Sequence, residues 1–526
     1  IGNGTFTYIK RLPGMRVTPT KTVLALKREE ITNKIDELRA RWVGLGFRQR
    51  PEDFKETYSA TPSATSCRVF LNTCLILDLH LAQGDVKKAF TLNPIDVELV
   101  VEQMPGTEIA GNWPGATKEN TVCLLHKCLE GLKQAGNIWQ VTHTAAILLF
   151  ELTKHRYKFK QSETDPTMFI LHCSIGIILI LVWTDDILIG YSNKSLYDEF
   201  VALYSARFPS KHHLGCVRFA GLTIDYSKGR SMTLHQRPHI ELAYDKFVVD
   251  KASASKSPAT SRIAVADRDS DKHYSKITMA ANDAERNIMK AKPFLAALAT
   301  MMYVGFWTLP HIVFHCSTLG QFMHDPSPAA FDAIIDLIIY AYHNRNHDII
   351  MYTTGSYTMP RQIPEAMRND FNAAYGAHVF CDASWQLRSV AAYVIMMCNG
   401  PIDWSSKIIR VICHSSSEAE IAAGCAAGKR TVFITNLYGD LHIVLVLPFF
   451  ALIDNSATLD LSKKLGVQPR TAHFLRWQHY LRWLVLHGYV KIFFVPTKEQ
   501  RADGMTKILD MSAFLVFCRF LYYYRK

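Results

Sequence analysis

Three aspartates in the first half of the chain lie in contexts that suit metal-dependent chemistry. Asp85 lies in the block Gly84–Phe90, and the doublet Asp185–Asp186 lies between two apolar runs. These runs predict two strands, so the doublet should occupy the tight turn of a hairpin. Carboxylate oxygens suit Mg²⁺, and two such ions stabilise both the attacking and the leaving oxygen of a phosphoryl transfer. The alternative is a solvated aspartate-rich turn, because an Asp-Asp pair alone is a weak signal.

Four more acidic residues follow in the last third of the chain. Asp382 and Asp454 each end a short apolar run that predicts a strand. Glu420 lies in an alanine-rich stretch that predicts a helix, and Asp503 lies where a last helix is expected to begin. One such aspartate would mean little, so the informative feature is the order of all four along strand, helix, strand and helix.

Two glutamates compete for the helical position of this second set. Ser415 and Glu418 have the spacing of a capping box, in which Glu418 would reach back to the backbone N–H of Ser415. That role would leave Glu420 to face the other carboxylates. We therefore predict that Glu420 is the functional residue and that Glu418 is a cap.

The motifs of the first half resemble those of copia-type LTR retrotransposon Pol polyproteins, in the region that holds reverse transcriptase and RNase H. In that family a first Asp lies in a D-V-K-x-A-F block and a Y-V-D-D turn supplies two more. Further matches follow in the family's order: Arg39–Gln49, Glu102–Gly106, Leu129–Ala135, Trp139, Asp165–Pro166, Leu214–Gly215 and Gly221. Collinear motifs are far more specific than any one of them.

The second acidic set resembles the RNase H active site, in which carboxylates also bind two metal ions for hydrolysis. Trp404–Lys407 and the pair Arg470–Thr471 accompany it in the family's order. Alignment on the Ile-Ala that follows Glu420 also favours that residue over Glu418.

The resemblance implies a role for each motif residue. The catalytic and metal-binding residues would be Asp85, Asp185, Asp186, Asp382, Glu420, Asp454 and Asp503. The cofactor would be Mg²⁺, two ions at each site, with Mn²⁺ as the alternative. Residues that would bind the incoming nucleotide are Arg39, Arg41, Phe90 and Lys133. Guanidinium groups suit phosphate oxygens, and a ring at Phe90 would exclude a ribose 2′-hydroxyl. The alternatives are a solvated basic hairpin for the arginines and plain core packing for Phe90.

Composition is compatible with these expectations. The chain has 526 residues, 48% of them hydrophobic and 20% charged, which is typical of a globular protein. A net charge of +12 and a pI near 9.0 favour a polyanionic partner, although a basic protein without one would look the same. The 12 cysteines are scattered, so we expect reduced thiols in an intracellular protein. No signal peptide opens the chain, and the start at Ile1 suggests a fragment or a processed product.

The expected fold class is α+β, a right-hand polymerase followed by an α/β RNase H-like domain. Residues 1–225 would form fingers and palm, 226–290 thumb and polar linker, 291–375 a connecting helical segment, and 376–526 the RNase H-like domain with a C-terminal tail. Expected partners are an RNA template, a DNA primer, an RNA–DNA hybrid and dNTPs. We expect no association with a membrane, because the apolar run Ile175–Trp183 is too short to span one. A homodimer stays open. The implied location is a cytoplasmic virus-like particle, with the nucleus as an alternative.

Several departures from the family pattern support a rival hypothesis, a decayed or co-opted copy that binds nucleic acid without polymerising. Trp183–Thr184 replaces Tyr-Val before the two aspartates, Glu130 replaces Tyr, Gly136 replaces Pro, and Ser384 replaces a second Asp. A third hypothesis is a copy that retains RNase H activity alone. Glu130 matters most, because it adds negative charge near the expected triphosphate site.

Overall fold

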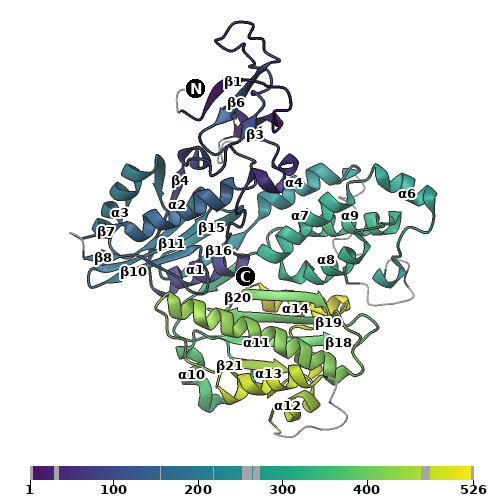
Figure 1. Cartoon of the computed structure of the whole chain (residues 1–526). Coiled ribbons are helices and arrows are strands. Elements are labelled where there is room, and N and C mark those ends of the chain that lie inside the picture. The colour runs from purple at the N-terminus through teal and green to yellow at the C-terminus, as the bar shows by residue number, and fades with distance from the viewer. Residues whose placement is uncertain are drawn as a thin grey trace. The chain divides into compact units, whose positions relative to one another are not determined.

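The structure is a computed structural model in which the chain divides into two compact units (Figure 1). It describes residues 4–28, 35–153, 156–216, 218–251, 263–264, 270, 273–463 and 474–522. Unit 1 comprises residues 1–62, 82–162 and 166–214, and unit 2 comprises residues 63–81, 163–165 and 215–526. Arg470, Thr471 and, within the expected thumb and polar linker, residues 252–262, 265–269 and 271–272 lie outside the described residues.

The core of unit 1 is a sheet with the strand order β13-β4-β12-β11-β10-β9. Its strands are β4 (His80–Val86), β9 (Lys160–Gln161), β10 (Met168–Cys173), β11 (Gly176–Trp183), β12 (Asp186–Tyr191) and β13 (Ser210–Leu214). β11 and β12 are the two predicted apolar strands, and they pair antiparallel from Ile178↔Tyr191 to Trp183↔Asp186. Helices α2 (Ala135–Leu149) and α3 (Lys194–Arg207) supply aromatic and aliphatic side chains to the same core.

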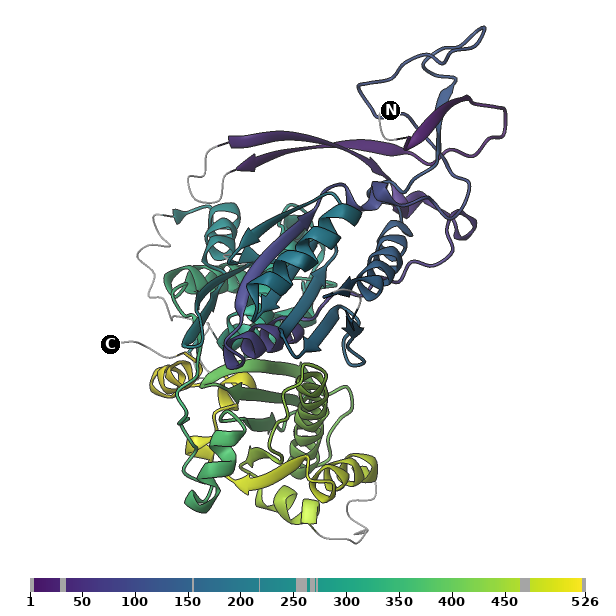
Figure 2. The same cartoon turned by 90° about the vertical axis from the view of Figure 1, so that its left-hand side faces the viewer.

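A second group of strands in unit 1 carries the basic motif. Strands β1 (Phe6–Lys10), β5 (Val100–Val101) and β6 (Thr121–Leu125) form a small sheet in the order β1-β6-β5. β2 (Thr20–Arg28) and β3 (Ile35–Gly44) pair antiparallel as the long two-stranded ribbon visible in Figure 2. Arg39 and Arg41 lie on β3 two residues apart, so they share one face of this ribbon.

Unit 2 begins with α1 (Ala64–Ile76), a helix capped by the Ser63 hydroxyl. The sheet β14-β15-β16-β17 comprises β14 (Arg218–Phe219), β15 (Leu222–Ser227), β16 (Ser231–His235) and β17 (Ile349–Tyr352). The helices between its last two strands include α4 (Arg237–Phe247), α6 (Asp283–Lys290), α7 (Phe294–Trp307), α8 (Val313–Leu319) and α9 (Pro328–His343). This sheet joins strands from three of the four segments expected from the sequence.

The strand-rich part of unit 2 is a mixed sheet in the order β20-β19-β18-β21-β22. β18 (His378–Ser384), β19 (Val390–Met397) and β20 (Gly400–Ile408) pair antiparallel, whereas β21 (Phe449–Ile453) and β22 (Val490–Phe494) run parallel to β18. The helices of this part are α10 (Arg368–Ala373), α11 (Ser416–Asp440), α12 (Ser456–Lys463), α13 (Leu475–Leu486) and α14 (Met511–Leu521). Figure 1 shows α11 and α13 covering one face of the sheet.

A buried arginine joins the parts of unit 2. Arg68 on α1 is 1% exposed, and its guanidinium stacks 3.8 Å from the centre of the Trp404 ring. It donates hydrogen bonds to the carbonyls of Ile402 (2.8 Å) on β20 and of Phe306 (2.9 Å) and Trp307 (3.0 Å) on α7. A buried charge needs such partners, so α1, α7 and the mixed sheet share one core.

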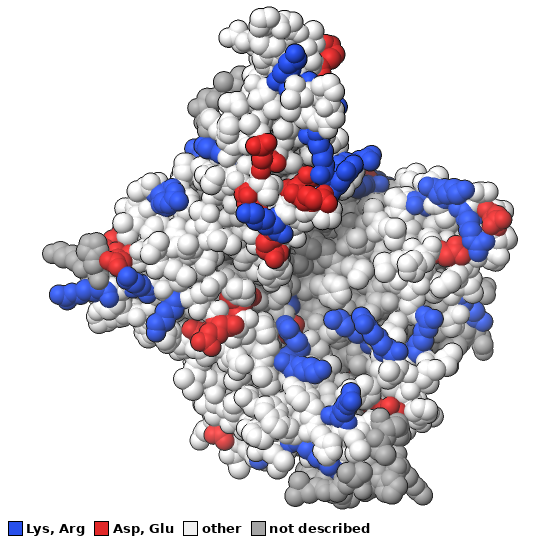
Figure 3. Space-filling view, viewed as in Figure 1, with Lys and Arg blue, Asp and Glu red and all other residues white. Residues whose placement is uncertain are grey.

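The predicted α+β fold class is confirmed, with the first part built on an antiparallel sheet and the last part on a mixed sheet covered by helices. Among the described residues, no helix has the length and apolar character needed to cross a bilayer. Basic side chains lie in several groups over the face drawn in Figure 3, with acidic side chains among them.

Candidate active sites

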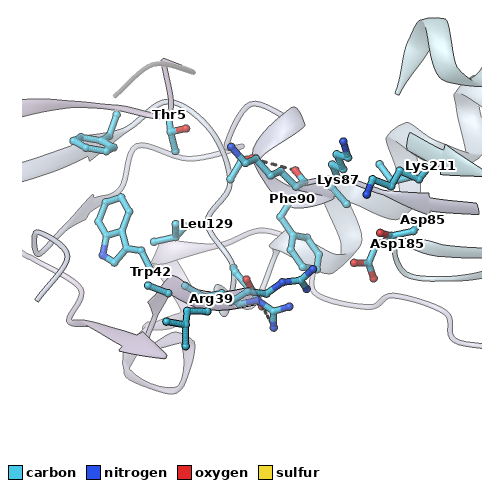
Figure 4. A pocket seen from close by; sticks show the side chains of 18 of the residues that line it. Thr5, Arg39, Trp42, Asp85, Lys87, Phe90, Leu129, Asp185 and Lys211 are labelled. Atoms are coloured by element: carbon cyan, nitrogen blue, oxygen red, sulfur yellow. Dashed lines mark hydrogen bonds and ion pairs between the residues drawn. The ribbon is translucent and has the colours of Figure 1, made fainter. Parts of the chain in front are cut away.

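A large open pocket in unit 1 brings the first set of sequence motifs together. Its volume is about 1160 Å³. Figure 4 shows Asp85 and Asp185 near one end, Phe90 in the middle, and Trp42 and Leu129 toward the other end. Its charged lining residues are Arg39, Arg41, Asp85, Lys87, Lys88, Glu130, Asp185 and Lys211. Five cations therefore face three carboxylates, which suits a polyanionic ligand.

Neighbouring strands position the two aspartates. Asp85 precedes the last residue of β4, and Asp185 lies in the turn between β11 and β12. The Val86 N–H donates to the Asp185 carbonyl at 2.9 Å, so the end of β4 and the turn are tied together. Gly84 makes this approach feasible, because a Cβ there would lie 2.8 Å from the Ile187 side chain and 2.9 Å from the His212 ring.

The aspartate turn is strained and is held by a buried ring. Thr184 has φ +56°, an uncommon conformation for a β-branched residue. The indole N–H of Trp139, a residue only 2% exposed, donates to the Thr184 carbonyl at 2.6 Å. Trp139 in turn stacks on His143 with ring centres 4.7 Å apart. Strain of this kind persists only where the surroundings enforce it, so Trp139 is a positioning residue for the turn.

Electrostatics at the turn favour cation binding. Asp185 is exposed to the pocket, yet the surrounding protein removes enough water from its carboxylate to raise its pKa. The negative charges of Asp85 and Glu130 raise it further, and the positive charge of Arg41 opposes them. A carboxylate crowded by other carboxylates is stabilised by a bound cation.

The predicted nucleotide-binding residues divide into two groups. Arg39, Arg41 and Phe90 line the pocket. Phe90 also packs against two apolar clusters, so it serves the core and the pocket together. Lys133 does not line the pocket: its ammonium lies 3.3 Å from the Gln49 carbonyl and 4.8 Å from the centre of the Phe54 ring. Asp186 starts β12 opposite Trp183 and is also absent from the pocket lining.

Glu130 reaches the pocket because two predicted motifs meet there. The Gly44 N–H donates to the Glu130 carbonyl at 2.8 Å, and the Gly46 N–H donates to the Gly131 carbonyl at 3.1 Å. Gly131 has φ +86°, and a Cβ there would lie 2.4 Å from the Val43 side chain. This close contact sets the Glu130 carboxylate against Arg41, with Nη1 and Oε1 3.6 Å apart.

The second acidic set converges in unit 2. Carboxylate oxygens of Asp382 on β18, Glu420 on α11 and Asp454 after β21 all lie within 4.8 Å of one another. Asp503 contributes to the same electrostatic environment. Asp503 begins a short 3-10 turn, Asp503–Met505, rather than the expected last helix, which starts later at Met511. Gly504, whose Cβ would lie 2.4 Å from the Phe517 ring, packs this turn against α14.

Burial and mutual repulsion raise the pKa of these carboxyl groups. For Asp382 burial is the main cause, followed by the charge of Asp503, while a hydrogen bond from the Thr506 hydroxyl opposes the shift. For Glu420 burial again comes first, followed by the charges of Asp382 and Asp454. The Ala383 N–H donates to Glu420 Oε1 at 3.3 Å and partly offsets them.

The donor set fits a hard divalent cation. All the converging ligand atoms are carboxylate oxygens, which Mg²⁺ prefers. Glu420 Oε2 and Asp503 Oδ1 are buried and accept no hydrogen bond from the described residues. Buried carboxylate oxygens without partners are costly, so a cation would satisfy groups that the protein leaves unsatisfied.

Glu418 is a capping residue, with one difference from the prediction. The Ser415 hydroxyl accepts from the Glu418 N–H at 3.2 Å, as expected. The Glu418 carboxylate, however, accepts from the N–H of His414 at 2.7 Å and not from that of Ser415. The loop before α11 presents His414 to this carboxylate. Ser384, at the position of the family's second Asp, accepts from the Val390 N–H at 3.1 Å and so closes the β18–β19 hairpin.

Some residues at these sites were not predicted. In unit 1 they are Lys87, Lys88 and Lys211, and the first two lie in the same sequence block as Asp85. In unit 2, Lys507 Nζ lies 2.9 Å from Asp503 Oδ2, and Thr506 bonds Asp382. Thr506 and Lys507 follow Asp503 by three and four residues, and this helical spacing could have predicted that they lie beside it. Lys211 had none, because its pairing with Asp85 arises from the β13–β4 register.

Comparison with known proteins defines the class of the first part of the chain. Residues 3–261 match the family model for reverse transcriptase (RNA-dependent DNA polymerase), and this segment belongs to that family. The match includes both motifs that line the unit 1 pocket and also α1 in unit 2.

The chain as a whole is related to the Pol polyproteins of copia-type retrotransposons. It is 25% identical over 515 residues to the retrovirus-related Pol polyprotein from transposon TNT 1-94 of Nicotiana tabacum, covering 97% of this chain and 36% of that protein. It is also 25% identical over 524 residues to the corresponding protein from transposon RE1 of Arabidopsis thaliana, covering 98% and 32%. The chain thus spans about a third of the length of these curated relatives.

Solved structures with detectable similarity include a foamy viral protease–reverse transcriptase in complex with double-stranded DNA. The two are 12% identical with a TM-score of 0.44, and the match covers 93% of this chain and 79% of that chain. A related foamy viral complex with double-stranded DNA gives 11% identity and a TM-score of 0.45, covering 93% and 67%.

Proposed function

We propose that this chain is an RNA-directed DNA polymerase that also cleaves the RNA strand of RNA–DNA hybrids. The observation that carries the proposal is the presence of two separate carboxylate sites in a chain whose first part belongs to the reverse transcriptase family. One site is an open pocket with cationic walls, and the other is a compact buried cluster. Those are the features expected for binding a triphosphate and for hydrolysing a phosphodiester.

In the polymerase site, Asp85 and Asp185 would hold the metal, and Arg39 and Arg41 would bind the phosphates of a dNTP. Asp186, from the start of β12, stays part of the proposed set. In the second site Asp382, Glu420, Asp454 and Asp503 would hold the metal. Mg²⁺, two ions at each site with Mn²⁺ as the alternative, would neutralise the charge that develops on the reacting phosphate.

The proposed partners are an RNA template, a DNA primer, the RNA–DNA hybrid formed from them, and dNTPs. A hybrid is A-like, so it would be held mainly by backbone contacts and shape. The proposed setting is a cytoplasmic virus-like particle, in which the chain is a monomer or a homodimer.

One observation favours a second candidate, a chain with strong hybrid cleavage and weak synthesis. Glu130 lies 3.6 Å from Arg41 inside the polymerase pocket and adds to the negative charge around Asp185. It therefore competes with a triphosphate for Arg41. In unit 2, Lys507 pairs with Asp503 at 2.9 Å, and the carboxylates of Asp382, Glu420 and Asp454 still converge.

Two matched variants of the full chain test both candidates. Asp185→Asn should abolish primer extension on an RNA template and leave hybrid cleavage near the wild-type rate. Asp454→Asn should do the reverse. Wild-type synthesis by the Asp185→Asn variant would refute the polymerase assignment. Weak synthesis by the wild-type chain, with cleavage intact, would select the second candidate.

A further inference from the structure

Unit 2 contains a second pocket that neither proposed activity uses. Its volume is about 570 Å³, within the range of small-ligand sites. It is lined by the loop 358–362, by β18 and β19, by the segment after β22 and by the end of α14. The aromatic and thioether side chains in its wall are Tyr352, Met359, His378, Phe380, Met396 and Phe520.

Three arginines and one glutamate supply the charged groups of this wall. Arg361 donates to Glu499 through Nε at 2.6 Å and also through Nη2, and the Gln362 amide donates to the same carboxylate. Arg361 therefore neutralises Glu499 within the protein. The remaining arginines, Arg501 and Arg519, have no ion-pair or hydrogen-bond partner among the described residues.

The pocket thus carries uncompensated positive charge. Arg501 and Arg519 lie in the same wall as Arg361, and a single carboxylate, that of Glu499, faces these three guanidinium groups. Such cations are unfavourable neighbours unless an anion joins them. A phosphate suits this arrangement, because guanidinium groups bind phosphate oxygens with paired hydrogen bonds.

The apolar part of the wall suits a flat ring. Phe380 and Phe520 meet edge to face with centres 5.3 Å apart, and Phe520 follows Arg519 directly in α14. Aromatic side chains stack on bases without strong preference for the base. Arg519 and Phe520, consecutive residues of α14, therefore contribute a cation and an aromatic ring to the same pocket.

We propose that this pocket binds one nucleotide unit, with its phosphate on Arg501 and Arg519 and its base against Phe520, whose ring the buried Phe380 supports edge to face. The ligand could be a free nucleotide or a residue of a single strand. Its lining residues differ from those of the two proposed metal sites, but β18 and the segment before Asp503 contribute to both this pocket and the unit 2 carboxylate cluster.

The test uses the full chain in EDTA, so that metal-dependent nucleotide binding is absent. Calorimetric titration with adenosine 5′-monophosphate should reveal a site whose affinity falls at least tenfold in the double variant Arg501→Gln/Arg519→Gln. Arg476→Gln, an exposed arginine of α13 outside the pocket, is the charge-matched control and should bind as the wild type does. An unchanged thermal midpoint identifies double variants that have retained their fold.

Two further ligands complete the test. Inorganic phosphate and adenosine should each bind at least tenfold more weakly than the nucleotide, since each makes half of the contacts. A single-stranded oligonucleotide that displaces the nucleotide identifies a strand as the source, and failure to displace it identifies the free nucleotide. Equal affinity of the double variant, or of inorganic phosphate in the wild type, would overturn the proposal.

Discussion

Arg41 and Glu130 form an ion pair inside the unit 1 pocket, with Nη1 and Oε1 3.6 Å apart. Both side chains are partly exposed, at 48% and 41%, so the pair itself adds little to stability. Its consequence is local: the guanidinium expected to bind a triphosphate already has a carboxylate partner.

Replacing Glu130 with Tyr, the residue of the family pattern, should therefore improve nucleotide binding. We expect the KM for dNTP to fall by about tenfold, equivalent to about 1.4 kcal/mol, because one negative charge leaves the pocket. Steady-state primer extension measures this effect. Asp198→Asn removes an exposed charge that pairs with Lys194 outside the pocket, and it should leave KM unchanged. An unaltered KM in the Glu130 variant would show that Arg41 does not contact the nucleotide.

Trp139→Phe should impair synthesis by loosening the Asp185 turn. The variant keeps a ring beside His143 but loses the hydrogen bond to the Thr184 carbonyl. Leaving that carbonyl unsatisfied should cost about 1–3 kcal/mol. We expect kcat for DNA synthesis to fall about tenfold with little change in KM, while hybrid cleavage stays the same. A parallel loss of both activities would instead indicate general unfolding.

Substitution of Glu420 should affect the rate of hybrid cleavage, whereas substitution of Glu418 should affect stability. Glu420→Gln removes a converging carboxylate and should reduce hybrid cleavage by at least a hundredfold, an order-of-magnitude expectation for losing a metal ligand. Glu418→Gln should lower stability by about 1 kcal/mol and leave most of the cleavage, because its carboxylate accepts from the His414 N–H just before α11 and is not among the converging carboxylates. The two variants are compared by cleavage rate and thermal midpoint, and the opposite pattern would reverse the assignment.

Unit 2 should lose stability in mild acid because it buries neutral histidines. Burial lowers the pKa of His315 to about 3 and of His347 to about 4, and it also lowers that of His311. Each ring protonates in the unfolded chain near pH 6.5 but stays neutral in the folded protein. The contribution of these neutral rings to the free energy of unfolding is therefore present above about pH 6.5. It is lost as the pH falls below that value, by up to about 1.4 kcal/mol per pH unit for each ring.

The thermal midpoint between pH 7.5 and pH 5.5 measures this acid sensitivity. His315→Gln should reduce the dependence of the thermal midpoint on pH, because the variant lacks one ring that is protonated in the unfolded chain but not in the folded protein. His343→Gln, a change at an exposed residue of α9, is the control and should leave the slope as it was. Identical slopes for the wild type and His315→Gln would contradict the prediction.

The local order of residues was enough to predict the four strands that carry or flank candidate carboxylates. Alternating or continuous apolar runs predict β11, β12, β18 and β21, because period and length are local properties. The ends of β11 and β21 locate Asp185 and Asp454, whereas Asp382 lies inside β18, which continues to Ser384. Cap chemistry likewise separated Glu418 from Glu420, since a capping box spans only four residues.

Only the tertiary structure decided which side chains face one another. Glu130 meets Arg41 because Gly131 lets the backbone of one motif pass against that of another far along the chain, and no local pattern encodes that contact. Lys133 lies in the same motif yet turns toward Gln49 and Phe54. Strand register likewise set Lys211 opposite Asp85. Pairing, register and packing depend on distant residues, so their outcome appears only in the folded chain.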